Sequence, residues 1–277
     1  MRAAPPRFAA LALSALAVVW TGRTSGADAR AAQAARGPES VPAVVGTQHR
    51  EGDKTTAAAS ESAPAERLCP RVLATHPHDP GAFTQGLLLH DGWLYESTGR
   101  DRGEARLRQV DPRTGVAARE IALPPAPDGG SYWGEGLALA GTRLIQLTWL
   151  HGVAFEYDLA TFLETGRFAY QGEGWGLCHD GTRLVMSDGS AMLTFRDAAT
   201  FEVLGQVVVT DAFGPVARLN ELECVGGDVY ANVFMTDDIV RINPRSGAVT
   251  AWIDASGLLS AEERAGANVL NGIAYDD

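Results

Sequence analysis

Five residues with chemically useful side chains occupy the same place in a repeated stretch of the sequence. Each comes directly before a Gly-Leu step or a close variant of it, and they are Gln85, Glu135, Trp175, Asn220 and Asn271. One acid, three amides and one indole are an unusual selection for a purely structural position, although a solvated ring of arbitrary polar residues is the alternative. A carboxyl group among indoles has a raised pKa, because burial disfavours its charged form, and such a group suits proton transfer near neutral pH.

Four aromatic residues keep a fixed spacing from these five positions. They lie fourteen residues after one of them or two residues before one: Trp149, Phe234, Phe83 and Trp133. The places equivalent to Trp149 in two other repeats are Gly99 and Gly189, which we expect to leave room beside the aromatic wall. An apolar wall that carries a few polar groups is the expected composition of a small-molecule pocket.

Several reaction classes find no support among these residues. The five positions include one carboxylate, no second acid, no histidine and no Ser-His pair, so neither two-carboxylate glycoside hydrolysis nor triad hydrolysis is indicated. Neither an HExxH nor a CxxC motif is present, so the sequence does not signal a zinc site. A net charge of −11 and a single lysine, Lys54, argue against a nucleic-acid partner.

The three cysteines, Cys69, Cys178 and Cys224, allow at most one disulfide bond. The sequence does not show which pair would form it, because connectivity depends on proximity in the fold. Our interpretation takes Cys178 and Cys224 as small buried core residues, since unpaired cysteine is among the most buried residue types.

Short strands are expected to position the five residues. The motif recurs at intervals of 50, 40, 45 and 51 residues, and Asp-Gly or Gly-Gly turn signals between apolar runs follow it. Four antiparallel strands in each repeat predict an all-β, five-bladed β-propeller whose last blade is truncated at the C-terminus. A β-sandwich would explain the turns but not the repeat. One short helix is expected after Ser260, where Glu263 completes a capping box.

The N-terminal part of the sequence is typical of export rather than of a fold. Arg2 and Arg7 precede a short apolar run that ends at Trp20, and the small residues 27–29 offer a cleavage site, so residues 1–29 are interpreted as a signal peptide. Residues 30–68 are interpreted as a disordered spacer and residues 69–277 as the propeller domain. A periplasmic or secreted protein is expected.

Five strings of the sequence together resemble the plant-type glutaminyl cyclases, which are glutaminyl-peptide cyclotransferases and also occur in bacteria. They occur in the family's order: HDPGAFTQG (78–86), WGEG (133–136), GWG (174–176), LNELE (219–223) and NGIA (271–274). The resemblance covers the chain from about residue 69 onward. It implies a five-bladed propeller and an acyltransferase that converts the N-terminal glutamine of peptides or proteins to pyroglutamate with release of ammonia. It implies no cofactor or catalytic metal; we also expect no membrane span, and a monomer.

The resemblance also implies roles for individual residues. Glu135 matches the catalytic acid/base of the family, and its pocket residues are matched by Gln85, Trp149, Trp175 and Asn220. The register of the repeats adds Phe83, Trp133, Phe234 and Asn271 to the expected substrate-binding residues. The side-chain amides of Asn220 and Gln85 are expected to hold the carbonyl oxygen on which negative charge develops.

The sequence departs from the family in two ways. Phe234 stands where the family usually has Trp, and the lysine expected in the channel is absent, since Lys54 lies in the spacer. We interpret the chain as truncated: the strand that follows Asn271 would have unpaired edges, and residues 71–76 would supply an outer strand to close the last blade.

Two other functions are compatible with the same residues. Carboxylate and amide oxygens around a propeller axis can bind Ca²⁺, as in lactonase-type propeller hydrolases, although the indoles argue against this. The missing lysine favours a third possibility, a peptide-binding propeller without catalytic activity.

Overall fold

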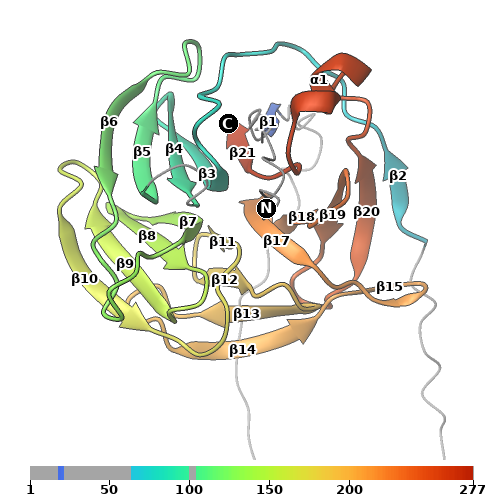
Figure 1. The fold of residues 1–277 in the computed structure, drawn as a ribbon. Helices are drawn as coiled ribbons and strands as arrows, with labels where there is room; N and C mark the ends of the chain where they lie inside the picture. Colours follow the sequence, from blue (N-terminus) through green and yellow to red (C-terminus); the bar gives the residue numbers. More distant parts are fainter. Residues whose placement is uncertain (1–17, 22–63, 100–103, 277) are drawn as a thin grey trace, which may run out of the picture.

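Four antiparallel sheets are arranged around a common centre in the computed structural model, which describes residues 18–21, 64–99 and 104–276 (Figure 1). Each sheet is one blade, and its first strand is the innermost. Blade one contains β3 (Thr84–His90), β4 (Trp93–Thr98), β5 (Arg106–Val110) and β6 (Ala117–Ala122). Blade two contains β7 (Gly134–Ala140), β8 (Arg143–Thr148), β9 (Val153–Asp158) and β10 (Glu164–Ala169). Blade three contains β11 (Leu177–His179), β12 (Leu184–Ser187), β13 (Met192–Arg196) and β14 (Val203–Val208). Blade four contains β17 (Leu219–Val225), β18 (Asp228–Val233), β19 (Asp238–Ile242) and β20 (Val249–Asp254).

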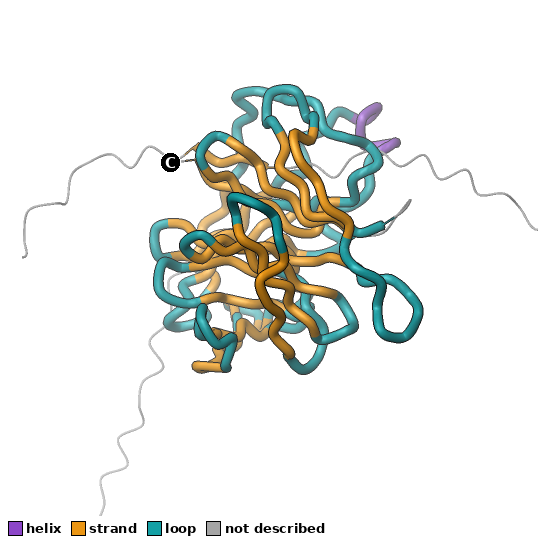
Figure 2. The backbone as a smooth tube through the Cα atoms, turned by 90° about the vertical axis from the view of Figure 1, so that its left-hand side faces the viewer, coloured by secondary structure: helices purple, strands orange, loops and turns teal. Residues whose placement is uncertain are grey.

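The remaining elements are short. They are β1 (Val18–Thr21), β2 (Glu66–Leu68), β15 (Thr210–Asp211), β16 (Gly214–Pro215), α1 (Ala261–Gly266) and β21 (Ile273–Asp276). The side view shows a body made mostly of strands, with loops at the ends of the sheets and α1 on the outside (Figure 2). Ser260 and Glu263 form the predicted capping box of α1. The predicted hairpin turns are confirmed as well: both Asp91 and Gly92, and both Gly226 and Gly227, have positive φ, which a tight two-residue turn requires.

The prediction of five blades is wrong, because four blades are complete and the fifth repeat contributes one strand. This strand, β21, lies between β17 and β3 and is the fifth inner strand of the ring (Figure 1). Within the described residues no hairpin partner follows it, so no further blade forms. The sequence motif marks inner strands, and a blade also needs three more strands outside each of them.

The edges of β21 are not left unpaired as the sequence analysis expected. On one side β1 pairs with it in parallel. On the other side three side chains of blade four accept its backbone N–H groups: Asn232 from Gly272 (3.1 Å), Glu221 from Ile273 (2.8 Å) and Glu223 from Tyr275 (2.9 Å). The expectation of a strand at residues 71–76 is also wrong. The strand forms earlier, as β2, and pairs in parallel with β20 of blade four.

Apolar side chains between neighbouring blades form the core. Strand residues alternate between the two faces of a sheet, so adjacent residues of one strand pack against different neighbours. Leu144 of β8 packs in the cluster shared with blade one, and Ile145 packs in the cluster shared with blade three. Similar clusters join blade three to blade four, and blade four to β21.

Glycine allows successive inner strands to approach one another closely. A Cβ atom on Gly86 would lie 2.5 Å from the backbone nitrogen of Leu137 in the next blade, and Gly136 and Gly176 face equally tight contacts. The fourth repeat has Glu221 at this place. Its carboxylate accepts a hydrogen bond from the backbone N–H of Leu87 (3.2 Å) in β3, besides the one from β21. This buried side chain therefore ties three inner strands together.

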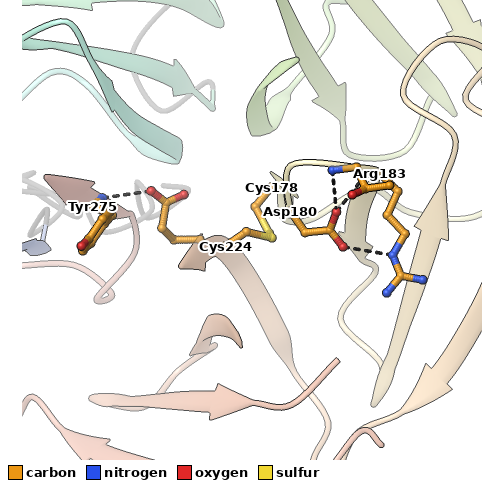
Figure 3. The surroundings of a disulfide bond; sticks show 7 residues. Cys178, Asp180, Arg183, Cys224 and Tyr275 are labelled. Atoms are coloured by element: carbon orange, nitrogen blue, oxygen red, sulfur yellow. Dashed lines mark hydrogen bonds and ion pairs between the residues drawn. A yellow bond between two sulfur atoms is a disulfide. The ribbon is translucent and has the colours of Figure 1, made fainter. Parts of the chain in front are cut away.

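A disulfide bond between Cys178 and Cys224 joins the inner strands of blades three and four (Figure 3). The sequence does not show this pairing. The interpretation of the two residues as small buried core residues holds for Cys178, which is buried, while Cys224 is partly buried and packs against the same core cluster. Their Cα atoms are 5.5 Å apart across the boundary between β11 and β17, a proximity that only the folded structure shows. Cys69 is exposed and unpaired.

The predicted signal peptide and spacer fall mostly outside the described residues. Of residues 1–29 the structure describes only β1, and of residues 30–68 only the end that contains β2. In the part of the chain that is described, no helix is long and apolar enough to cross a membrane.

We expect Gly86→Ala to destabilise the protein, because its new methyl group would overlap backbone atoms that cannot move without opening the ring. Overpacking of this kind costs about 1–3 kcal/mol of unfolding free energy. Gly205→Ala in β14 is the matched control, since the nearest atom to its Cβ lies 4.0 Å away. Urea unfolding of the two variants checks this, and equal stabilities would contradict the packing argument.

Candidate active site

The five ring residues of the sequence analysis lie at one end of the five inner strands. Gln85, Glu135 and Asn220 are each the second residue of an inner strand, and Trp175 and Asn271 come two residues before β11 and β21. The acid and the three amides are buried, and Trp175 is half-buried. We call this end of the ring the mouth.

A chain of side-chain amides leads to Glu135. Asn271 Nδ2 donates a hydrogen bond to Gln85 Oε1 (2.6 Å), and Gln85 Nε2 donates one to Glu135 Oε1 (3.1 Å). Asn271 Nδ2 also donates to the backbone oxygen of Thr84 (3.1 Å). These hydrogen bonds connect residues from three of the repeats, so they fix the position of the carboxyl group of Glu135 at the mouth.

The pKa of Glu135 is raised well above the usual glutamate value of 4.5. Burial of the carboxyl group is the main cause, because the charged form loses its water. The nearby carboxylate of Glu173 raises the pKa further, and the indole N–H of Trp133, which stabilises the charged form, lowers it. Glu135 can therefore both accept and return a proton closer to neutral pH than an exposed glutamate.

Aromatic rings form an arc at the mouth that includes Trp133 next to Glu135, and their contacts are edge to face. Phe83 lies 5.9 Å from Trp133, and Trp133 lies 6.0 Å from Trp149, measured between ring centroids. In blades three and four, Trp175 and Phe234 lie 5.3 Å apart. The predicted wall residues are thus brought together in two groups, one on each side of the boundary between blades two and three.

The two glycines expected to leave room beside this wall do not leave it empty. A Cβ atom on Gly99 would lie 2.5 Å from the indole of Trp133, and one on Gly189 would lie 2.7 Å from the indole of Trp175. These glycines therefore accommodate the indoles, so the space belongs to the wall and not to a ligand.

Glu173 is a site residue that the sequence analysis missed. Its Oε2 atom accepts hydrogen bonds from the indole N–H of Trp149 (2.7 Å) and of Trp175 (2.8 Å), so it connects the two groups of the arc. The signal was present, since Glu173 comes two residues before Trp175, in the register of Phe83 and Trp133. Glu173 is not aromatic, so the aromatic register of Phe83 and Trp133 does not predict it.

Three polar groups at the mouth are available for a ligand. Asn271 Oδ1 is buried and has no hydrogen-bond partner, and Trp133 Nε1 makes no well-aligned hydrogen bond, although it lies close enough to the carboxyl group of Glu135 to stabilise its charged form. The side-chain amide of Asn220 makes no hydrogen bond to any described residue. Because unsatisfied buried polar atoms are costly, an acceptor and a donor left open beside Glu135 indicate a polar ligand.

A buried ionic network within blade one supports the mouth. The carboxylate of Glu96 accepts hydrogen bonds from Arg108 (2.9 Å) and from the hydroxyl of Thr84, and its Oε1 lies 2.8 Å from His78 Nε2. Arg108 also binds Asp79 at 2.7 Å. These contacts hold the segment that leads into Gln85, which gives the HDPGAFTQG string a structural role.

The donor geometry does not suit a Ca²⁺ ion. Gln85 turns its NH₂ group, not its oxygen, toward Glu135, whereas Ca²⁺ needs several convergent oxygens. In residues 64–99 and 104–276, no three His, Cys, Asp or Glu side chains gather as a metal site would need. A separate hollow beside β21 is lined by apolar and tyrosine side chains, among them Ile239, Ile253 and Ile273, and offers no acid or amide.

Comparison with known proteins connects this site to one family. The family model described as glutamine cyclotransferase matches residues 47–277. A glutaminyl-peptide cyclotransferase from Arabidopsis thaliana is 42% identical over 211 residues, which cover 74% of this chain and 64% of that protein's length. The crystal structure of Myxococcus xanthus glutaminyl cyclase has 37% sequence identity and a TM-score of 0.69, and the match covers 76% of this chain and 89% of the other.

We expect Glu135→Gln to stabilise the fold increasingly as the pH rises. The pKa of Glu135 is higher in the folded than in the unfolded chain, so the folded state binds more protons between the two values. Below pH 4.5 Glu135 is neutral in both states, and its protonation contributes fully to the free energy of unfolding of the wild type. This contribution is lost as the pH rises through the folded pKa. The glutamine variant has no such loss.

Urea unfolding at several pH values from 4.5 upward measures this difference. Glu202→Gln, which removes one exposed carboxylate from the outer surface, is the control. A difference between Glu135→Gln and wild type that stays constant with pH would show that Glu135 is not held protonated by burial.

Proposed function

The chain belongs to the glutamine cyclotransferase family, and from that premise we propose that it cyclises the N-terminal glutamine of peptides to pyroglutamate and releases ammonia. The observation that carries the proposal is the buried Glu135, which accepts a hydrogen bond from Gln85, itself held by Asn271, and which lies next to Trp133 of the aromatic arc. The likeness to the Arabidopsis and Myxococcus proteins supports it. The chain spans about two thirds of the length of the Arabidopsis protein.

The reaction joins two ends of one residue. The free α-amine of the substrate attacks the side-chain amide carbon, a new C–N bond closes the five-membered lactam, and the bond to the side-chain nitrogen breaks. The amine must be neutral to attack, although its usual pKa is about 7.7–8.0. One proton must also reach the leaving nitrogen, because an amide anion is a poor leaving group.

Glu135 serves both needs with a single proton. Its carboxylate takes one proton from the α-ammonium group, and the resulting carboxylic acid gives this proton to the nitrogen that departs as ammonia. The attacking nitrogen loses its second proton to the departing ammonia, which leaves as ammonium, or to solvent. The raised pKa of Glu135 lies closer to the pKa of the substrate's amine, so proton transfer costs less free energy in either direction. General acid–base catalysis of this kind contributes roughly 10² to 10⁴ in rate.

The polar groups left open at the mouth match the substrate's amide. Trp133 Nε1 and the NH₂ group of Asn220 can donate to the carbonyl oxygen as negative charge develops on it, and Asn271 Oδ1 can accept from the substrate's nitrogen. This revises the role expected for Gln85, whose NH₂ group already donates to Glu135. Gln85 orients the acid instead of holding the oxyanion.

The shape of the aromatic arc favours the cyclisation reaction. Its indoles surround the flexible glutamine side chain on one side, and a folded conformer places the amine close to the amide carbon. The wall also excludes water, which would otherwise compete for the carbonyl group.

We also propose that the protein is exported to the periplasm or secreted. The composition of residues 1–29 supports this, and so does the disulfide bond between Cys178 and Cys224, since such bonds persist in oxidising compartments. A monomer stays our prediction for its oligomeric state.

We expect Glu135→Gln to lower ammonia release from a Gln-Xaa dipeptide by at least about a hundredfold, because the glutamine keeps the shape but cannot carry the proton. A coupled assay for ammonia gives kcat and KM, and circular dichroism verifies folding. Glu202→Gln should retain wild-type rates. Activity of Glu135→Gln within about threefold of wild type would overturn the assignment, given that removing a general acid–base costs far more.

A further inference from the structure

Glu173 links the two groups of the aromatic arc through a polar contact. Ring contacts run from Phe83 to Trp149 on one side and from Trp175 to Phe234 on the other, and no ring contact joins Trp149 to Trp175. Both indole N–H groups point instead at the same oxygen atom, Oε2 of Glu173. The two indoles come from different blades, so this carboxylate spans a boundary between sheets.

The second oxygen of Glu173 is not used in the same way. Oε1 accepts no hydrogen bond from a described residue, and no described arginine or histidine forms an ion pair with this half-buried carboxylate. Glu173 accepts both indole N–H groups through one atom, and among the described residues no ion pair determines its position. Hydrogen bonds from N–H groups to a charged acceptor are also stronger than those to a neutral one.

We propose that Glu173 is the positioning residue of this site: its carboxylate fixes the indoles of Trp149 and Trp175 against each other and so sets the shape of the wall that folds the substrate's side chain. The inference rests on the proposed function for its kinetic consequences. The arrangement of the indoles can be tested without it.

The charge of Glu173 has a second effect, on Glu135. Burial is the main reason for the raised pKa of Glu135, and repulsion by Glu173 adds to it. Among the described residues, the phenol of Tyr170 also interacts with Glu135, and it donates its hydrogen bond to the backbone oxygen of Thr148. No described residue forms an ion pair with Glu135. Removing the charge of Glu173 should therefore lower the pKa of Glu135.

Backbone contacts hold the loop that carries Glu173, so its substitution should not unfold the protein. The N–H of Gly174 donates to the backbone oxygen of Trp149 (3.0 Å). The backbone oxygen of Trp175 accepts a hydrogen bond from the N–H of Gly136 (2.7 Å). The backbone N–H of Trp175 donates to the backbone oxygen of Ser187 (3.1 Å). A variant at position 173 therefore changes the indoles and the charge while the strands around them stay paired.

Two variants separate the two effects. Glu173→Gln removes the charge but keeps an oxygen that can accept the indole N–H groups, whereas Glu173→Ala removes both. Glu202→Gln controls for the loss of one carboxylate elsewhere. For Glu173→Ala we expect KM for a Gln-Xaa dipeptide to rise about tenfold, the size of one charge-assisted hydrogen bond. Glu173→Gln should keep KM within about threefold of wild type, since its hydrogen bonds remain.

The pH profile reports the charge. In kcat/KM, the limb that belongs to Glu135 should move to lower pH in both variants and stay in place in Glu202→Gln. Substrates with different amine pKa values identify the other limb, because only that limb moves with the substrate. A purely structural residue would change KM without moving the Glu135 limb, and that result would overturn the second effect.

A spectroscopic measurement tests the geometry independently of activity. The chain has six tryptophans, and ¹⁵N-labelled indoles give one N–H signal each. Two signals, assigned by Trp149→Phe and Trp175→Phe, should shift strongly in Glu173→Ala and less in Glu173→Gln. Unchanged signals and an unchanged KM in Glu173→Ala would overturn the proposal. If the wild type releases no ammonia while these two signals shift, the proposed function fails and the positioning role stands.

Discussion

The close approach of successive inner strands is the constraint on which the rest of the structure depends. At Gly86, Gly136 and Gly176 a side-chain carbon would collide with the backbone of the next strand, so the ring can close only where these residues have none. The fourth repeat departs from this pattern. There the buried carboxylate of Glu221 accepts backbone N–H groups from β3 and β21 and closes the ring from within. Because the residue before each of these positions lies at the mouth, the packing of the ring also assembles the site.

The site uses a group that the fold alone would not favour. Burial and a neighbouring carboxylate raise the pKa of Glu135, and the same is true of Glu221 beside Glu223. The two acids differ in their partners. Both oxygens of Glu221 accept backbone N–H groups, which gives it a structural role, whereas Glu135 receives one amide N–H and faces open polar atoms. An acid that is costly to bury and incompletely satisfied is typical of a catalytic position.

The sequence predicted whatever repeats with a fixed period, and it failed where a contact crosses between repeats. Turn signals such as Asp91-Gly92 and the spacing of Gln85 and Glu135 depend on local geometry, so the strands and the common position of these residues at one end of the inner strands could be predicted. The blade count was wrong, because the motif at Asn271 marks an inner strand and says nothing about strands outside it. The pairing of Cys178 with Cys224 and the bridge from Glu173 to two indoles depend on the distance between blades, which a single sequence does not show.

The central claim is that this mouth recognises a free N-terminal glutamine and transfers one proton within it. Mass spectrometry of three peptides incubated with the full chain tests it most directly: one with N-terminal glutamine, the same peptide with an acetylated amine, and one with N-terminal asparagine. The account predicts the loss of one ammonia from the first peptide alone, because only that peptide has both the nucleophile and an amide at the distance of a five-membered ring. Loss of ammonia from the acetylated peptide, or from none of the three, would contradict it.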